Sequence, residues 1–183
     1  MKVTATALDG VLVLEPKVFG DERGFFLESW NARVFREATG LDVAFVQDNH
    51  SRSAGNVLRG IHYQVVRPQG KLVRVVTGSV FDVAVDLRRA SPTFGKWFGV
   101  SLSAENKKQL WIPPGFGHAF FVTSESADFL YKTTEYWYGE HDRSIRWNDP
   151  TLAIAWPLGR GVPVLAQKDA QAPLFAEAQV FDA

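Results

Sequence analysis

Short strand-like runs are the feature that most constrains what this chain can fold into. The clearest run is 81–87, where large apolar residues alternate with aspartate and alanine. A period of two is typical of a strand whose two faces have different surroundings. A second β-rich run precedes it within 73–87, and Gly78-Ser79 between them suits a tight turn. The pair therefore predicts a β-hairpin.

Similar runs recur along most of the chain, separated by turn residues. Further strands are predicted at 11–14, 24–28, 44–49, 97–102, 108–112, 119–123 and 129–136. Repeated short strands at this spacing are typical of an all-β sandwich or barrel. From about Pro150 onward the chain is richer in proline and glycine, which predicts loops and short turns packed on the sheets.

One helix is predicted after 29. Ser29 can act as its N-cap, Trp30, Val34 and Ala38 recur at four-residue spacing, and Gly40 can end it.

Composition narrows the class of protein. The 183 residues contain no repeat or linker and predict a single domain over 1–183. A formal net charge of zero gives no bulk attraction to nucleic acid or to an anionic membrane, so neither is expected as a partner. The absence of cysteine excludes disulfides and thiolate chemistry. It suits a reducing compartment, and with no signal-peptide pattern at the start we expect a cytoplasmic protein.

Two of the four histidines lie in informative contexts. His62 follows Arg59-Gly60 and is separated by one residue from Gln64, so that His62 and Gln64 share a face if the segment is a strand. His118 ends the run 113–118, Pro-Pro-Gly-Phe-Gly-His, which resembles the Pro-x-Gly-x-x-His motif of cupins. We interpret His50 and His141 as ordinary polar residues in a barrel wall.

The sequence departs from the metal-binding cupins. Those proteins carry His-x-His followed by Glu, whereas this chain has His62-x-Gln64 and no glutamate until Glu105. A transition metal generally needs at least three converging nitrogen, oxygen or sulfur ligands. We therefore expect no bound metal.

Beyond the cupin signature, motifs across nearly the whole chain resemble those of the dTDP-4-dehydrorhamnose 3,5-epimerases. The matching segments are 21–28 (DERGFFLE), 47–51 (QDNHS), 58–64 (LRGIHYQ), 70–74 (GKLVR), 78–86 (GSVFDVAVD), 113–120 (PPGFGHAF), 130–132 (LYK), 147–150 (WNDP) and 168–169 (KD). Their order along the chain is that of the family.

This resemblance implies an all-β, cupin-type double-stranded β-helix or jelly-roll barrel with a few short helices. It also implies an isomerase that inverts C3 and C5 of dTDP-4-dehydro-6-deoxy-D-glucose in dTDP-L-rhamnose biosynthesis. The substrate is a dTDP-4-keto-6-deoxyhexose, and no cofactor is needed because a base, an acid and a cation can move the protons through an enolate.

The resemblance also assigns catalytic roles. His62 matches the general base and Asp169 the carboxylate that pairs with it. Tyr131 matches the acid on the other side of the sugar, and Lys71 the cation beside the enolate oxygen.

The same resemblance assigns substrate contacts. Arg23 and Arg59 match residues that contact the diphosphate and sugar, and arginine suits phosphate because its fork binds two oxygens. The remaining assigned contacts are Phe19, Phe26, Glu28, Gln47, Asp48, Asn49, His118, Tyr136, Asp142 and Lys168. Among these, Phe19, Phe26 and Tyr136 suit stacking on thymine, and the family usually has glutamate at the position of Asp142.

Family members are homodimers with an exchanged N-terminal segment, so we expect a homodimer in which 11–14 pairs with the partner. Four alternatives stay open. Two lie within this fold family, a 3- or 5-epimerase acting at one carbon and a 3,4-ketoisomerase, although Gln64 replaces a histidine that ketoisomerases tend to carry. The others are a metal-dependent cupin and a non-catalytic sugar-binding cupin.

Overall fold

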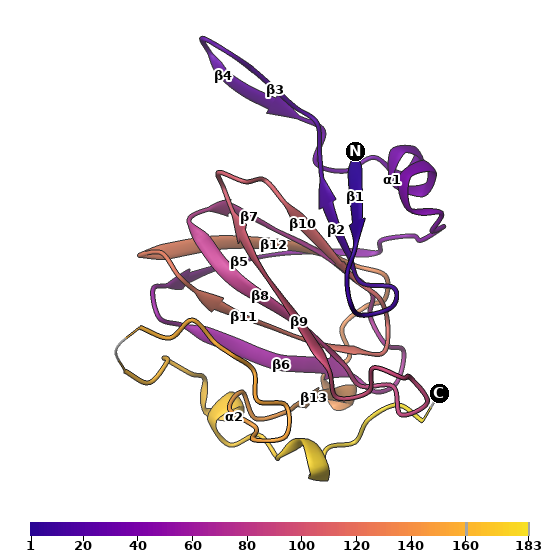
Figure 1. Cartoon of the computed structure of the whole chain (residues 1–183), viewed down its shortest axis with the longest axis vertical. Coiled ribbons are helices and arrows are strands. Elements are labelled where there is room, and N and C mark those ends of the chain that lie inside the picture. Colours follow the sequence, from indigo (N-terminus) through magenta and orange to yellow (C-terminus); the bar gives the residue numbers. More distant parts are fainter. Residues whose placement is uncertain (160, 183) are drawn as a thin grey trace.

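A computed structural model describes residues 1–159 and 161–182. Two antiparallel sheets are packed face to face (Figure 1). The larger sheet contains, in spatial order, β1 (Lys2–Ala5), β2 (Leu12–Glu15), β10 (Gln109–Ile112), β7 (Lys71–Thr77), β12 (Ser126–Thr133) and β5 (Gln47–Ala54). The smaller contains β13 (Asp142–Ser144), β6 (Leu58–Gln64), β11 (Phe116–Val122), β8 (Ser79–Asp86) and β9 (Trp97–Ser103).

The predicted all-β class with a few short helices is confirmed, but the sheets are not closed into a barrel. Within the described residues, no ladder of hydrogen bonds joins one sheet to the other, so the fold is a sandwich with free edges. β5 forms one edge of the larger sheet and β13 one edge of the smaller.

Alternation along β8 explains the core. Val80 and Ala84 pack between the sheets in one buried cluster, while Val83 and Val85 pack in a second cluster beneath the C-terminal segment. Both faces of this strand are therefore buried, but against different parts of the protein. This agrees with the alternation in its sequence, which predicted two faces with different surroundings. Asp82 lies on the same face as Val80 and Ala84, which carries its carboxylate into the interior.

The hairpin predicted at Gly78-Ser79 is wrong. β7 pairs with β10 and β12, whereas β8 pairs with β9 and β11, so the chain changes sheets at Gly78. The turn itself is real: Gly78 has φ +72°, and a Cβ there would lie 1.9 Å from the carbonyl oxygen of Ser126. A tight turn can connect two packed sheets as well as two paired strands, and local sequence does not separate the two cases.

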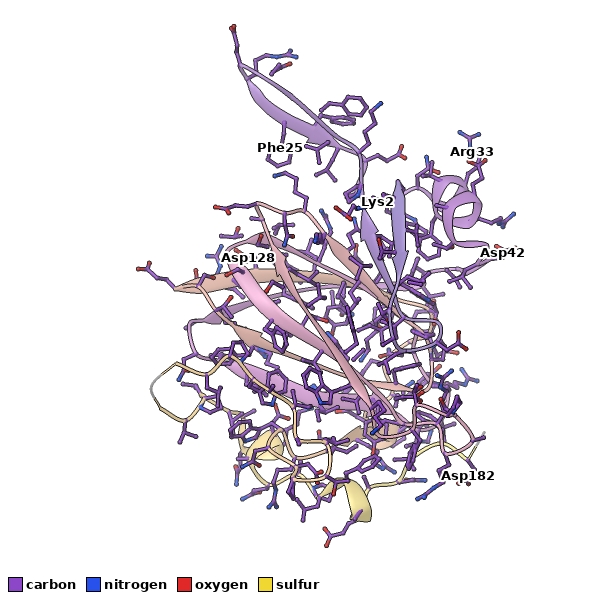
Figure 2. The ribbon with its side chains drawn as sticks, in the orientation of Figure 1. Lys2, Phe25, Arg33, Asp42, Asp128 and Asp182 are labelled. Atoms are coloured by element: carbon purple, nitrogen blue, oxygen red, sulfur yellow. The ribbon has the colours of Figure 1, made fainter. Side chains whose placement is uncertain are left out.

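The predicted pairing of 11–14 with a partner subunit is wrong, because β2 pairs on one side with β1 and on the other with β10 of the same chain. The rest of the N-terminal region has two parts. β3 (Val18–Asp21) and β4 (Gly24–Leu27) form a two-stranded arm that extends away from the sandwich, with Phe25 among its exposed side chains (Figures 1 and 2). Helix α1 (Ala32–Thr39) then covers part of the larger sheet, where Phe35 packs against Trp111. Its N-cap is Asn31 rather than the predicted Ser29, whereas Gly40 ends it in the left-handed conformation, as predicted.

From Pro150 onward, the described residues contain only two short helices, α2 (Gln167–Ala170) and η2 (Phe175–Glu177); a third, η1 (Gly139–His141), precedes β13. This confirms the predicted loops and turns after Pro150. This C-terminal segment packs on the outer face of the smaller sheet and brings α2 beside β6. Among the helices of the described ranges, none is long and apolar enough to cross a membrane.

A bulge in β6 decides which of its side chains point inward. His62 opposes His118 and Arg59 opposes Phe120, so β6 advances three residues where β11 advances two. The extra residue allows Arg59 and His62 to line the same cavity, although a regular strand would place them on opposite faces. Gly60 has φ +121°, and a Cβ there would lie 2.4 Å from the Cβ of Ala119.

Gly60→Ala should therefore destabilise the fold by about 2–4 kcal/mol, because backbone strain and overpacking act together. Gly24→Ala is a matched control: its φ is +127°, but nothing lies within 4 Å of a Cβ there. Urea denaturation of both variants separates the two contributions. Equal losses of stability would show that packing against Ala119 does not matter.

Candidate active site

A cavity of about 350 Å³ opens between the two sheets. Both sheets and the C-terminal segment contribute to its wall. Of the residues predicted from sequence, its lining contains Asn49, Arg59, His62, Lys71, His118, Tyr131, Asp142 and Lys168. The fold thus brings together residues that are separated by more than a hundred positions in the chain.

His62 and Asp169 form the clearest functional pair. Nε2 of His62 lies 2.6 Å from Oδ1 of Asp169, which comes from α2 and is 1% exposed. The amide of Gly60, at the bulge, donates to Oδ2 of the same carboxylate at 3.4 Å. A carboxylate on one ring nitrogen fixes the orientation and tautomer of the imidazole. Among the described residues, Nδ1 of His62 has no hydrogen-bond partner and is available to the cavity.

A second histidine–aspartate pair lies directly across the strand ladder. His118 opposes His62 in register, and its Nε2 lies 2.9 Å from Oδ2 of the fully buried Asp82. The His118 ring stacks on Phe129, with centroids 5.8 Å apart. Oδ1 of Asp82 has no partner within the described part of the chain. Sequence reasoning did not assign Asp82 to the site.

Lys71 and Tyr131 supply the remaining polar chemistry. Burial lowers the pKa of the Lys71 ammonium to about 8, and the carboxylates of Asp142 and Asp82 partly oppose this shift. Burial raises the pKa of the Tyr131 phenol, and Asp142 raises it further, so the phenol keeps its proton. Lys168 holds Asp142 at the cavity wall through a 3.0 Å ion pair.

The outer wall is made of polar groups and one large aromatic ring. Nε of Arg59 donates to Oγ of Ser53 at 2.9 Å, which orients the guanidinium at the rim. A second hollow beside the cavity shares Asn49 and Tyr131 with it and adds Gln47. Trp137 lines both spaces. The lining residues that sequence reasoning missed are His50, Ser51, Gln69, Phe120, Phe129 and Trp137.

Several predicted contacts lie away from this cavity. Arg23, Phe19 and Phe26 lie on the projecting arm, where Phe26 is 69% exposed and Arg23 pairs with Asp21. Glu28 follows the arm and is also exposed. Two others lie outside the lining for different reasons: Asp48 pairs with Lys132 on the outer face of the larger sheet, and Tyr136 is exposed beside Trp137.

The donor set does not suit a transition metal. Across residues 1–159 and 161–182, no group of three or more His, Asp or Glu side chains is arranged to hold one. Gln64, which stands where metal-binding cupins carry a second histidine, instead has its amide bound to the backbone of three other residues. What the arrangement can do is move protons: an oriented imidazole comes from one sheet, and a phenol and an ammonium come from the other.

Comparisons with known proteins agree with this chemistry. The family model described as dTDP-4-dehydrorhamnose 3,5-epimerase matches residues 5–177. A dTDP-4-dehydrorhamnose 3,5-epimerase from Pseudomonas aeruginosa is 62% identical over 99% of each chain. The crystal structure of dTDP-6-deoxy-D-glucose-3,5-epimerase from Legionella pneumophila, in complex with dTDP-4-keto-L-rhamnose, has a TM-score of 0.96 and 52% identity, covering 100% of this chain and 98% of that one.

A more distant structure has a narrower activity. It is a 3'-monoepimerase from Streptomyces bikiniensis in complex with dTDP-quinovose, with a TM-score of 0.88 and 35% identity, covering 93% of this chain and 86% of that one.

The ammonium of Lys71 should titrate with a midpoint of about 8, against 10.5 for an unperturbed lysine. It therefore loses its charge as the pH rises through 8, because the buried charged form is disfavoured. Lysine-selective ¹⁵N NMR, assigned with Lys71→Arg, measures the midpoint. Asp142→Asn should lower it further, because that carboxylate favours the ammonium. A midpoint near 10.5 would contradict the burial of the charge.

Proposed function

We infer that this chain, which belongs to the dTDP-4-dehydrorhamnose 3,5-epimerase family, inverts C3 and C5 of dTDP-4-dehydro-6-deoxy-D-glucose to give dTDP-4-dehydro-L-rhamnose. It is an isomerase of dTDP-L-rhamnose biosynthesis. The main structural support for the mechanism is that the reactive side chains come from different sheets. His62 belongs to one sheet and Tyr131 to the other, and both line one cavity.

The 4-keto group of the substrate determines what the protein must do. It acidifies the protons on C3 and C5, because the electron pair left after deprotonation moves onto the keto oxygen as an enolate. Inversion follows when a proton returns to the opposite face of the same carbon. Atoms and charge balance without a redox step, so a base, an acid and a stabilising cation suffice.

His62 acts as the base at both carbons; between the two steps it releases the first proton to solvent and Tyr131 regains a proton from solvent. Its Nδ1 takes the proton, and the imidazolium that forms is stabilised by Asp169 at 2.6 Å. The buried carboxylate also holds the ring in the tautomer that leaves Nδ1 unprotonated. A neutral imidazole suits reversible removal of a carbon acid's proton near neutral pH.

Lys71 stabilises the enolate oxygen. Its pKa of about 8 leaves it mainly charged at neutral pH while a low-dielectric wall surrounds it. A positive charge in such a place stabilises growing negative charge more than it would in water. Tyr131 delivers the new proton from the face opposite His62, since its raised pKa keeps the phenol protonated until the enolate forms.

The rim of the cavity binds the rest of the substrate. Arg59 and Lys168 provide positive charge for the diphosphate, and Asn49, His118 and Asp142 contact the sugar. No metal or cofactor takes part in this mechanism. We propose that the enzyme works in the cytoplasm, which its cysteine-free sequence suits.

The projecting arm supports a homodimer. Phe19, Phe25 and Phe26 are more than half exposed on β3 and β4, which is unfavourable for an isolated chain. We propose that the arm packs on a second copy, where Arg23, Phe19, Phe26 and Glu28 complete the partner's nucleotide site. A closed two-fold arrangement then completes both sites equally.

Solvent-deuterium exchange into dTDP-4-keto-6-deoxyglucose, followed by NMR after EDTA treatment, tests the mechanism. The wild type should label both C3 and C5, and His62→Ala should label neither. Tyr131→Phe should still exchange, because His62 can return a deuteron to the face it came from, while inversion slows by about 10²-fold or more.

Tyr63→Phe is the matched control. Tyr63 lies beside His62 on the other face of β6 and bonds Gln179 by its hydroxyl, so the variant should turn over normally. Label at one carbon only would identify the single-site epimerase that the Streptomyces bikiniensis structure exemplifies. No exchange by the wild type, or exchange that EDTA abolishes, would overturn the proposal.

Subunit mixing tests whether the arm acts on the partner. Arg23→Ala and His62→Ala homodimers should each be nearly inactive. Random exchange of subunits should restore about a quarter of wild-type activity, because half of the dimers are mixed and each holds one intact site. Sedimentation checks the dimer itself. If mixing restores nothing although subunits exchange, Arg23 acts within its own chain.

A further inference from the structure

Segment 134–138 crosses the mouth between the two sheets and carries Trp137 at the rim of the cavity. It has no regular secondary structure. Its backbone is instead bound by glutamine side chains from elements of both sheets and from the loop between β6 and β7. These glutamine contacts are separate from the proposed proton transfer, and they fix the backbone that carries Trp137.

Gln64 holds the segment to the smaller sheet. It is the last residue of β6, is 3% exposed, and its Oε1 accepts the amide of Tyr138 at 2.8 Å. Its Nε2 donates to the carbonyl oxygens of Arg67 at 2.7 Å and Tyr136 at 3.2 Å. One buried amide therefore joins two loops. Removing it would leave three backbone groups of these loops without their partners.

Gln47 holds the same segment to the larger sheet. It begins the edge strand β5, and its Oε1 accepts the amide of Trp137 at 3.1 Å while its Nε2 donates to Asn49 at 3.0 Å. Consecutive amides, those of residues 137 and 138, are thus held from opposite sheets. Gln69 adds a further hydrogen bond, from its Nε2 to the carbonyl oxygen of Glu135.

These hydrogen bonds position the indole of Trp137. It is 60% exposed, and its ring lies beside Gly139, where a Cβ would approach it to 2.9 Å. In the hollow beside the main cavity it is joined by Gln47, Asn49 and Gln69. An open indole face among amides suits a flat, polar heterocycle. Tyr131 also lines that hollow, where it adjoins the main cavity, whereas His62 and Lys71 do not.

We propose that Gln64 and Gln47 are positioning residues that fix Trp137 for the nucleotide end of the substrate and leave the proton-transfer groups unaffected. This rests on the proposed function, since it concerns the affinity of the same site. Both glutamines act through the backbone of 137 and 138, without touching the reacting carbons.

Gln64→Met and Gln47→Met remove the amides while keeping the length of the side chain. Each should raise KM by about tenfold and change kcat by less than about twofold, the fold-change expected for losing one or two such hydrogen bonds. Calorimetry with dTDP alone should show the same loss of affinity. Hydrogen exchange should quicken at the Tyr138 amide in Gln64→Met and at the Trp137 amide in Gln47→Met.

A double-mutant cycle separates positioning from general destabilisation. In a Trp137→Ala background, Gln64→Met should weaken dTDP binding by less than about twofold, because its effect runs through the indole. Gln179→Met is the control: this exposed glutamine bonds Arg143 and should leave every readout unchanged. If Gln64→Met fails to fold, the half-buried Gln47→Met carries the test.

A fall in kcat at unchanged KM, or additive effects in the cycle, would overturn the positioning role. A wild type that binds dTDP but exchanges no proton would overturn the proposed function instead, and the dTDP affinities would still decide this inference.

Discussion

The buried hydrogen bond between His62 and Asp169 is the interaction on which the site depends. A carboxylate that is 1% exposed needs partners for both oxygens, and here they are the imidazole and the amide of Gly60. Asp169 reaches them only because the apolar C-terminal segment packs on the outer face of the smaller sheet. Hydrophobic packing of the C-terminal segment thus places Asp169 beside His62. The bulge at Gly60 both supplies an amide donor to this carboxylate and turns Arg59 toward the cavity.

The sandwich architecture gives the site its two chemical sides. A strand from each sheet faces the shared interior, so the imidazole on β6 and the phenol on β12 line the cavity from different directions, as the proposed base and acid require. The interior also concentrates charge. Asp82, buried by the alternation of β8, and Asp142, held by Lys168, both favour the ammonium of Lys71 against the burial that disfavours it. Neutral pH then lies on the charged side of the Lys71 titration.

Local sequence predicted the strands better than their partners. The alternation at 81–87 correctly indicated a strand with two different faces, and Gly40 correctly indicated the end of α1, since both signals are local. Pairing is not local, so Gly78 was interpreted as a hairpin turn although it joins two sheets. β5 extends to Ala54 without detection because its residues are polar on both faces. Motif identity predicted eight of the residues that line the cavity, although six others predicted with them lie elsewhere. The bulge that turns Arg59 inward leaves no periodic signal.

The place of the cavity follows from the sandwich being open. A closed barrel has no free edge, whereas here β5 and β13 both end their sheets. Backbone groups at such edges need partners or a cover. Segment 134–138 lies between these two edges in the chain and is tied to both sheets, by Gln47 from the edge strand of one sheet and by Gln64 from the strand next to the edge of the other. Neither glutamine had a signal for this role, because an amide that binds a distant backbone has the same local pattern as one that binds a ligand. The rim of the site is therefore built by the contacts that close the fold.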